Sequence, residues 1–392
     1  MGELLNNTDN ILNNFPLLLR NNIKHICLQS TIGFLRIGLD DITIVSNIHS
    51  IKYDLDQNFH LVFKIPYAGK KLKWEIIFDP EEYEFAPDFD FNDEEFMSYF
   101  SIETTFENSH AWKNWNVKNP ESLSRLINEF LVVYKKYQIE KLKLENIMYS
   151  RYLEEYEVLI RKMEGIQDDN VQISIEGNSV VFLIALKIDC SSLPEYMDVR
   201  KRYNVSYEQL PLDAGTDFCH LKVSILKSEG MRLNCSVILS PRLGQALENF
   251  KFYKTDFKKD TPLIDIVSSV SKKIANRIQQ IVALNKLKKI YITNIVSRCV
   301  DGITEYDVMS FNEAVFSYSI NDYTCLVSVN IGSKFPSERP SLVLTSMMCK
   351  DVKCTKIVQK YPYDCNLSPD MNVKNLFEFL PEIVEEFKLH KH

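Results

Sequence analysis

Glycine is scarce in this sequence. It fills 11 of 392 positions, under half of the roughly 7% that is usual in globular proteins. Loops that cradle a phosphate need glycine, because a side chain would keep the backbone away from the ligand. Neither common nucleotide-binding motif, G-x-G-x-x-G or G-x-x-x-x-G-K-[ST], occurs in the chain. We therefore exclude the usual nucleotide-binding loops and expect no cofactor.

The chain also lacks an excess of positive charge and any long apolar run. Its 46 Lys and Arg against 53 Asp and Glu give a net charge of -7, which argues against nucleic acid as the main ligand. The longest apolar run, Val180–Leu186, is far short of the roughly 20 residues that span a bilayer. Met1–Asn6 lacks the basic region of a signal peptide. We expect no nucleic-acid or membrane partner, and a cytoplasmic and nuclear location.

Paired cysteines are missing too. The nine cysteines include no C-x-x-C pair, and an odd number of unpaired thiols is typical of a reduced, intracellular protein. Cys349, Cys354 and Cys365 cluster near the end of the chain, where His390 and His392 also lie. Zinc sites are usually built from two close pairs of ligands. We therefore predict no metal site.

The hydrophobic pattern predicts three segments in which the same order of strands and helices recurs: residues 1–164, 165–284 and 285–392. In the first we expect a helix at 4–15, strands at 23–37, 42–51, 60–66 and 72–78, with a hairpin at Gly69 between the last two. Helices with a break should follow over 119–163. In the second we expect strands at 171–175, 180–188, 218–226 and 233–239, then a helix at 261–281. In the third we expect a helix at 286–298, strands at 305–311, 314–319 and 323–331, then the proline-containing segment 335–344, and a helix from Asn372 with a break or kink at Pro381. Strands that precede helices in each segment indicate an α+β fold.

A proline pattern supports this repetition. Pro87-x-Phe-x-Phe91 follows a strand in the first segment, and Pro340-x-Leu-x-Leu344 follows a strand in the third. A strand, then an aromatic-Pro-x-x-x-Pro-x-apolar-x-apolar loop and a helix, resembles the ubiquitin-conjugating (E2) fold and its inactive UEV and RWD variants. Phe335-Pro336 shows this best, whereas Tyr83 occupies the first proline's place in the first segment.

One longer segment is more specific. Phe63–Phe78 closely resembles the BRE family, the UEV-like scaffold subunits of the BRISC and BRCA-A deubiquitinase assemblies. Further matches follow in the same order, at Pro87–Phe91, Trp115 with 119–121, Leu239–Arg242 and Tyr361–Tyr363. The stretch from Ile42 to Asp56 departs from the vertebrate pattern. The resemblance implies three serial UEV-like modules, each an antiparallel meander packed on helices.

The catalytic residues of an E2 are absent. An active E2 needs a cysteine nucleophile after the proline loop, preceded by His-Pro-Asn to stabilise the oxyanion. Residues 92–118 contain neither, and His110 stands alone there. No cysteine lies between Pro241 and Arg298 either. We therefore predict a non-catalytic protein without catalytic residues. The cysteines beyond the third proline loop leave an alternative open, a residual ubiquitin-transfer enzyme that uses Cys354 or Cys365.

Two stretches are candidate partner-binding surfaces. Asp79–Glu95 holds nine acids and no Lys or Arg, so Asp88 and Asp90 either belong to a solvated acidic loop or attract a basic partner. The second stretch lies in the third module, where UEV-like domains are implied to bind an extended, proline-containing peptide over aromatic walls. Its candidate residues are Tyr361, Pro362, Tyr363, Phe379 and Phe387. Phe377 and Trp74 are expected in the core.

The resemblance also implies the partners. A von Willebrand A-like adaptor subunit is expected on the C-terminal module, and an Abraxas-type MPN scaffold and a JAMM/MPN+ deubiquitinase at the other end. The implied assembly cleaves lysine-linked, non-degradative ubiquitin chains, and direct contact with ubiquitin is left open. A second alternative also remains, a free UEV-like peptide or cargo receptor outside any deubiquitinase.

Overall fold

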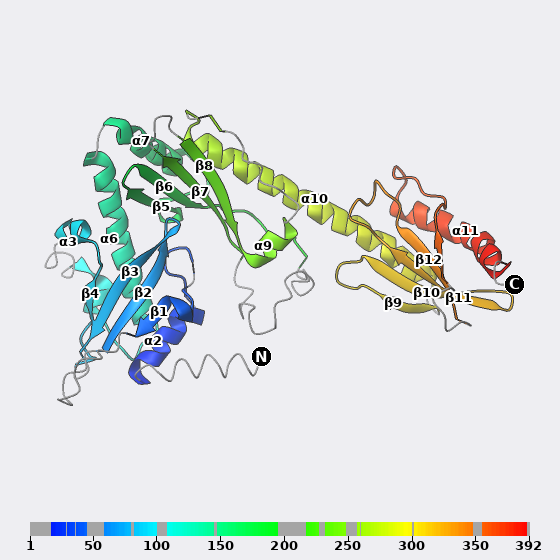
Figure 1. Cartoon of the computed structure of the whole chain (residues 1–392), viewed down its shortest axis with the longest axis horizontal. Helices are drawn as coiled ribbons and strands as arrows, with labels where there is room; N and C mark the ends of the chain where they lie inside the picture. Colours follow the sequence, from blue (N-terminus) through cyan, green and yellow to red (C-terminus); the bar gives the residue numbers. More distant parts are fainter. Residues whose placement is uncertain are drawn as a thin grey trace. The chain divides into compact units, whose positions relative to one another are not determined.

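The protein has an α+β fold with three separate antiparallel sheets (Figure 1). The computed structural model describes residues 17–28, 30–35, 37–44, 59–79, 82–99, 108–144, 147–194, 217–226, 232–247, 257–258, 260–299, 302–347 and 355–389. The chain divides into two compact units. The first contains Met1–Ile188, Tyr203–Gly244 and Lys251–Lys272, and the second contains Asp189–Arg202, Gln245–Phe250 and Lys273–His392.

The first sheet is a meander in the order β1-β2-β3-β4. Its strands are β1 (Ile42–Ile44), β2 (Phe59–Tyr67), β3 (Lys70–Phe78) and β4 (Asp88–Asp90), with a short 3-10 helix, η1 (Leu39–Asp41), before β1. The turn from β2 to β3 passes through Ala68 and Gly69, with φ angles of 47° and 83°. Two consecutive positive φ angles are typical of a tight hairpin turn. The hairpin predicted around Gly69 is therefore confirmed.

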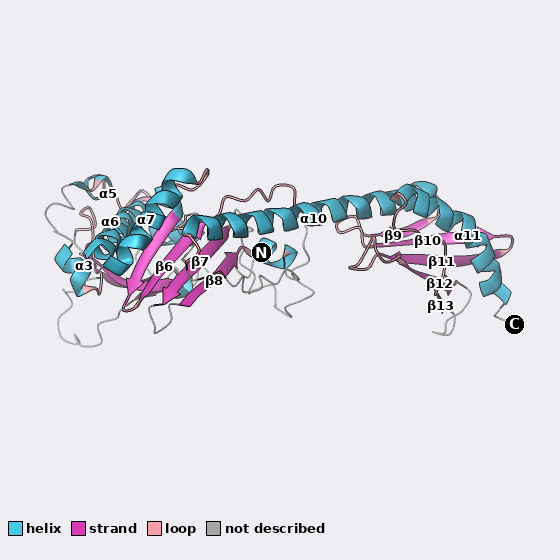
Figure 2. Ribbon diagram, turned by 90° about the horizontal axis from the view of Figure 1, so that it is seen from above, coloured by secondary structure: helices cyan, strands magenta, loops and turns pink. Residues whose placement is uncertain are grey.

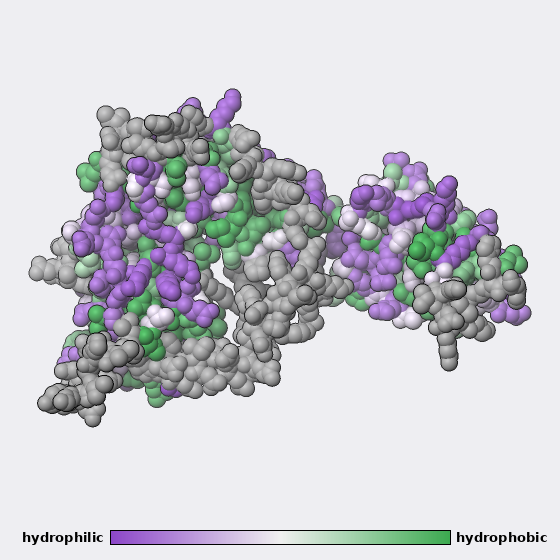
Figure 3. All heavy atoms as spheres, viewed as in Figure 1, coloured by the Kyte–Doolittle hydropathy of each residue, from purple (hydrophilic) through white to green (hydrophobic). Residues whose placement is uncertain are grey.

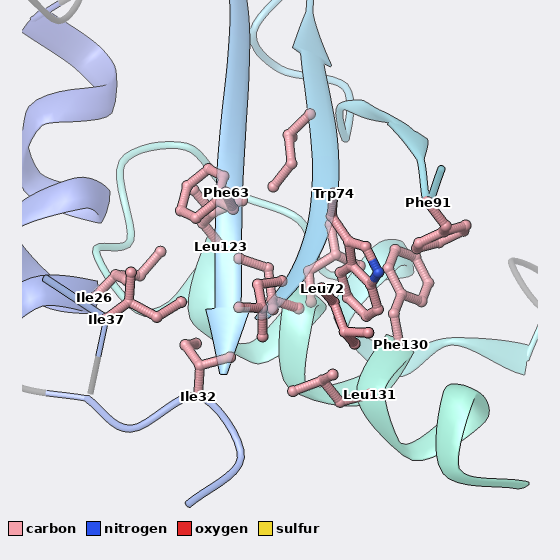
Figure 4. Close-up of a cluster of buried hydrophobic side chains, with 14 of the residues drawn as sticks. Ile26, Ile32, Ile37, Phe63, Leu72, Trp74, Phe91, Leu123, Phe130 and Leu131 are labelled. Atoms are coloured by element: carbon pink, nitrogen blue, oxygen red, sulfur yellow. The ribbon is translucent and has the colours of Figure 1, made fainter. Parts of the chain in front are cut away.

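Among the described residues, four helices accompany the first sheet: α2 (Leu17–Leu28), α3 (Glu94–Tyr99), α5 (His110–Lys113) and α6 (Ser122–Leu144). The inward face of the sheet and the apolar face of α6 form one core (Figure 4). Trp74 is 1% exposed and meets Phe91 edge to face, with ring centroids 4.9 Å apart. Phe130 of α6 also contacts Phe91 edge to face. The prediction that Trp74 is a core residue is confirmed.

The start of the chain corrects one prediction. We expected a strand at 23–37, but α2 occupies its first part. Leu19, Ile23 and Ile26 recur at three- and four-residue spacing and are fully buried, which is the period of a helix and not of a strand. The helix predicted at 4–15 lies outside the described residues. Of the strand predicted at 42–51, the described part is β1.

The second sheet also belongs to the first unit, in the order β5-β6-β7-β8. Its strands are β5 (Val171–Glu176), β6 (Ser179–Ala185), β7 (Cys219–Leu226) and β8 (Arg232–Leu239), with α7 (Ile147–Lys162), η2 (Asp168–Asn170) and α9 (Pro241–Ala246) around them. The five central residues of β6 are buried on both faces of the sheet, which explains the unbroken apolar run in the sequence. The break predicted in the helices before Met163 falls between α6 and α7.

The hairpin of the first sheet touches the second sheet within this unit. The Ala68 amide donates to Gln172 Oε1 of β5 at 2.8 Å, and Lys222 Nζ of β7 donates to the Gly69 carbonyl at 3.3 Å. A Cβ atom on Gly69 would lie 2.5 Å from Lys222 Nζ. This is one position where the scarce glycine is needed both for the turn and for a close approach.

Helix α10 (Leu263–Arg298) replaces the two helices predicted at 261–281 and 286–298. The intervening residues, Val282–Asn285, include neither Gly nor Pro, so nothing in the chain interrupts the helix. Its residues up to Lys272 belong to the first unit and the others to the second. The boundary that we predicted between residues 284 and 285 falls inside it, and the division into three modules stays a prediction.

The third sheet lies in the second unit, in the order β13-β12-β11-β10-β9. Its strands are β9 (Ile303–Tyr306), β10 (Glu313–Ile320), β11 (Tyr323–Asn330), β12 (Ser341–Ser346) and β13 (Thr355–Val358), followed by α11 (Pro369–Leu389). Residues of α10 and α11 share one core with the inward side chains of the sheet, and Figure 2 shows both helices on the same side of it. We had not predicted β13.

Two proline predictions have different outcomes. Pro87 directly precedes β4 and Pro340 directly precedes β12, and each of these strands pairs with the strand before it, so the place of the proline recurs, whereas the repeat of a whole module stays a prediction. In contrast, α11 continues through Pro381, so the alternative of a break there is wrong, and a kink stays a prediction. Leu380, Ile383 and Val384 are all buried in one core, and tertiary packing of this kind overrides local propensity. None of the described helices is long and apolar enough to span a membrane.

Candidate functional site

The segment that would carry the nucleophile of an E2 lies between β4 and α6. In this chain it contains α5, whose first turn is capped by Ser109: the Ser109 hydroxyl accepts from the Trp112 amide at 3.0 Å. Glu129 of α6 holds the same turn from the other side. Its carboxylate accepts from Ser109 Oγ at 2.5 Å and from the Ala111 amide at 3.0 Å. The sequence analysis missed Glu129, because its partners lie 18 to 20 residues earlier in the chain.

This arrangement positions a helix turn and not a reactive group. Both carboxylate oxygens of Glu129 are used for holding α5, and His110 is exposed at the start of that helix. Residues 92–118 contain no cysteine, so no thioester can form on this segment. Beside it lies an open cavity of about 350 Å³, lined by His110, Ala111, Asn114, Asn119, Ser122, Arg125, Asn128, Glu129 and Val132.

The thiols of the described residues are mostly shielded. Burial, together with the nearby Asp41 charge, raises the pKa of Cys27 to about 12. Burial alone raises the pKa of Cys235 and of Cys299 to about 11. Because the thiolate is the reactive form, such groups are poor nucleophiles at neutral pH. Of the two cysteines in the transfer alternative, Cys365 is exposed, whereas Cys354 lies outside the described residues.

We find no candidate metal site in the described part of the chain, where no three His, Cys, Asp or Glu side chains are close enough to hold an ion. Cys349, Cys354, His390 and His392, which prompted the question, lie outside that part. The prediction of no metal site therefore stays a prediction for the C-terminal cluster.

The acidic stretch includes Glu95, which makes structural contacts, and the exposed Asp88 and Asp90. Glu95 accepts from Tyr137 at 3.0 Å and from Lys141, and Lys141 is the main reason why the pKa of Glu95 is lowered. Asp90 is exposed but accepts from the Asn92 amide at 2.8 Å. Asp88 is exposed on β4, the edge strand of the first sheet. These contacts do not decide whether the acidic stretch is a solvated loop or attracts a basic partner. Partner binding by Asp88 and Asp90 therefore stays a prediction.

In the second unit, two of the candidate tyrosines hold the proline loop. The buried Tyr361 donates its hydroxyl to the Pro340 carbonyl at 2.6 Å, and the half-buried Tyr363 donates to the Pro336 carbonyl at 2.6 Å. Arg339 lies over the Tyr361 ring, 5.7 Å from its centroid. Both tyrosines therefore fix the loop that resembles the E2 signature. Spacing in the sequence could not reveal this role, because the partners are 21 and 27 residues away.

The other candidate residues of this unit differ in exposure. Phe387 is buried against Tyr323, and Phe379 is half-buried against the same core. Pro362 is exposed. Phe377, expected in the core, stacks on the buried Phe316 with ring centroids 5.5 Å apart. Pro362, Tyr363 and Phe379 therefore have solvent-accessible side-chain atoms, which a partner needs for contact. Tyr361 and Phe387 are buried and support these residues from beneath.

The outward faces of the first and third sheets differ in charge. Side chains directly opposite each other in a register share a face of the sheet. On the face of the first sheet that points away from its core, the charged residues are Lys64, Lys71, Lys73, Glu75, Asp88 and Asp90. Lys71 pairs with Asp41 at 2.5 Å and Lys73 with Glu75 at 2.8 Å.

The corresponding face of the third sheet carries two charged residues, Glu305 of β9, which lies opposite Val315, and Glu313 at the start of β10. Along β11 to β13 none of its described members is charged. Its other members are Val315, Ser317, Ser319, Thr324, Leu326, Ser328, Asn330, Ser341, Val343, Thr345, Thr355 and Ile357. We call these uncharged residues the neutral face.

Comparison with known proteins agrees with the resemblance read from the sequence. The family model described as "Brain and reproductive organ-expressed protein (BRE)" matches residues 15–349. A protein of Branchiostoma floridae named "BRISC and BRCA1-A complex member 2" is 29% identical over 336 residues, which cover 83% of this chain and 82% of that protein. Its namesake in Danio rerio is 26% identical over 333 residues, with 83% and 82% covered. Because the family model spans most of the sequence, this chain belongs to the BRE family.

Proposed function

We propose that the chain is a non-catalytic scaffold subunit of a BRISC-type deubiquitinase assembly. In this proposal three serial UEV-like modules, residues 1–164, 165–284 and 285–392, bridge a von Willebrand A-like adaptor to an Abraxas-type MPN scaffold and a JAMM/MPN+ protease. The protein works in the cytoplasm and nucleus and supports cleavage of lysine-linked ubiquitin chains in trans. Direct contact of one module with ubiquitin is part of the same proposal.

The observation that carries this proposal is the replacement of an E2 nucleophile segment by a structural one. Residues 92–118 contain no cysteine, and the helix turn within them is held by both oxygens of Glu129. The names of the relatives in Branchiostoma floridae and Danio rerio describe them as complex members. A chain that keeps the fold pattern without the reactive group is suited to presenting surfaces to partners.

The three sheets support the modular part of the proposal. Each is a separate antiparallel sheet accompanied by helices. The proline that precedes β4 recurs before β12, at the same place in the meander. The fastening of the third proline loop by Tyr361 and Tyr363 gives that module a rigid surface, on which Pro362 is exposed. We place the adaptor on this surface.

Co-expression of the chain with the three proposed partners tests the assembly. We expect deletion of residues 372–392 to release the adaptor while the protease pair is retained, and retention of the adaptor would refute its placement. Because that deletion removes the buried Leu376 and Leu380, a milder variant is also needed. Pro362→Asp changes one exposed side chain and should weaken adaptor binding, whereas Lys136→Asp, on exposed α6 surface, should leave it unchanged.

A thioester assay separates the scaffold from the transfer alternative. The chain is incubated with ubiquitin, ATP and the ubiquitin-activating enzyme, and the products are run on a gel without reductant. We expect no thiol-sensitive adduct. An adduct that disappears in Cys365→Ser or Cys354→Ser would show that the chain transfers ubiquitin, and the non-catalytic proposal would then fail.

A further inference from the structure

We infer that the cavity between α5 and α6 binds the side chain of a lysine from a partner protein. Its volume is about 350 Å³, at the small end of the roughly 300–1,000 Å³ that is usual for ligand pockets. A pocket of this size takes one long side chain. The inference rests on the proposed function only where it assigns the lysine to a subunit of the deubiquitinase assembly.

Glu129 supplies the negative charge of this cavity. Its carboxylate is half-buried, and its two donors, the Ser109 hydroxyl and the Ala111 amide, are both neutral. Among the described residues, no Lys or Arg forms an ion pair with it, whereas the half-buried Glu155 of the same unit pairs with Arg151 at 2.7 Å. Over β2 and β3, where hydrophilic side chains gather on the face drawn in Figure 3, the lysines also form ion pairs within the chain. A half-buried carboxylate without a cation attracts one from outside.

The positive groups that line the cavity do not cancel this charge. Arg125, one turn earlier on α6, forms an ion pair with Glu121. His110 is exposed, and a histidine side chain is usually neutral at pH 8. Residues 100–107, which precede α5 in the chain, contain no Lys or Arg. The charge left at the cavity is therefore that of Glu129, which favours a cationic ligand.

The rest of the lining matches a lysine. This side chain has an apolar stem and a compact ammonium with three donors. Ala111 and Val132 offer apolar surface to the stem, and Val132 is 52% exposed. Each oxygen of Glu129 accepts one hydrogen bond within the protein, and a carboxylate can accept about four in all. Asn114 and Ser122 line the same cavity with further oxygens. An arginine gains most from a carboxylate with two free oxygens, so the single-point contact of a lysine fits better.

Methyl NMR of the full chain at pH 8, with alanine and valine methyl groups labelled, tests this inference. The probe is Nα-acetyl-lysine methylamide, and its control at equal ionic strength is the norleucine analogue, which keeps an apolar stem and lacks the ammonium. We expect the lysine probe to shift the Ala111 and Val132 methyl signals with a Kd on the order of 1–10 mM. The norleucine analogue should leave them unchanged. No response to the lysine probe, or equal shifts with both compounds, would overturn the inference.

Two variants separate the charge of the cavity from its space. Glu129→Gln removes the charge and keeps the shape, and should weaken binding of the lysine probe about tenfold or more. Val132→Trp fills the cavity without touching Glu129 and should weaken binding similarly. The control is Glu154→Gln on the exposed surface of α7, which should bind like the wild type. Circular dichroism checks that each variant is folded. A folded Glu129→Gln variant that binds the probe like the wild type would contradict the inference.

Measurements on the assembly keep this inference apart from the proposed function. When the chain is co-expressed with the three proposed partners, Glu129→Gln and Val132→Trp should each lower the retention of one partner, whereas Glu154→Gln should not. If the wild-type chain retained no partner, the proposed function would fail, and the probe measurement would still decide whether the cavity binds a lysine. If the wild type assembled and both cavity variants retained every partner equally well, the inference would be overturned while the proposed function stood.

Discussion

The first and third sheets share an inward plan and differ in their outward faces. Inward, each sheet buries large aromatic and aliphatic side chains against helices, with Trp74 in one and Phe316 in the other. Outward, the first sheet carries ion pairs, whereas the described face of the third carries two acids, Glu305 and Glu313, and no Lys or Arg. The comparison teaches that the inward face fixes the fold, whereas the outward face is free to be adapted to solvent or to a partner.

The largest effect is expected where the two sheets are alike. Trp74→Ala and Phe316→Ala each remove a side chain that is at most 1% exposed, and each should cost about 3–5 kcal/mol as a cavity-forming change. Urea unfolding followed by circular dichroism and by hydrogen exchange of each unit measures both losses. If Phe316→Ala cost less than about 1 kcal/mol, the two inward faces would not be equivalent.

A second prediction separates the units by their response to acid. His220 of β7, in the first unit, is 4% exposed and stacks on Phe218, and burial lowers its pKa to about 4. The unfolded chain, with a pKa near 6.5, therefore binds more protons than the native state between about pH 4 and 6.5. Stability should fall by up to about 3 kcal/mol as pH drops through that window.

The matched variant for this prediction is His220→Phe, which keeps the ring and removes the titrating group. Denaturant unfolding at pH 7.5, 5.5 and 4.5 should show a smaller loss for the variant than for the wild type. The described residues of the second unit include no histidine, so exchange protection in that unit should change little over this window. Equal acid sensitivity of His220→Phe and wild type would remove His220 as the cause.

These differences show how far the sequence could be interpreted. Alternation and turn residues located β2, β3 and their hairpin at Gly69, because both signals are local. The strand predicted at 23–37 was wrong because the short apolar spacing of Ile23 and Ile26 suits a helix. We also predicted two helices where the structure has the single helix α10. The residues between them include no Gly or Pro that would end a helix.

The roles of the candidate site residues were harder to predict than the strands, because they depend on contacts between residues far apart in the sequence. Absence of a cysteine in residues 92–118 was visible at once. The role of Glu129, and the anchoring of Tyr361 to the Pro340 carbonyl, join residues about 20 positions apart, and no pattern in a single sequence marks such pairs. The neutral face likewise required the register of the strands, because a one-residue shift would move its members to the other side.

Three glycines provide a graded third prediction. Gly69 has φ of 83°, and a Cβ atom there would meet the flexible end of Lys222, which must shift. Gly177 has φ of 51° and open space, and Gly332 has open space without a positive φ. Alanine should therefore cost about 1–3 kcal/mol at Gly69, about 1 kcal/mol at Gly177 and close to nothing at Gly332. Thermal unfolding of the three variants measures the series. Equal costs at Gly69 and Gly177 would show that Lys222 yields without penalty.

The smallest effect is expected on the charged outward face. Lys71→Ala removes the exposed ion pair with Asp41 and should cost no more than about 0.5 kcal/mol, because water and salt screen such pairs. Thr345→Ala, at an outward position of the third sheet, is the matched control without charge. The free energy of unfolding at 50 mM and 500 mM NaCl measures both. The cost of Lys71→Ala should shrink with salt, whereas that of Thr345→Ala should not. A salt-dependent cost for Thr345→Ala would mean that the third sheet's outward face senses charge, and the contrast between the two faces would then be lost.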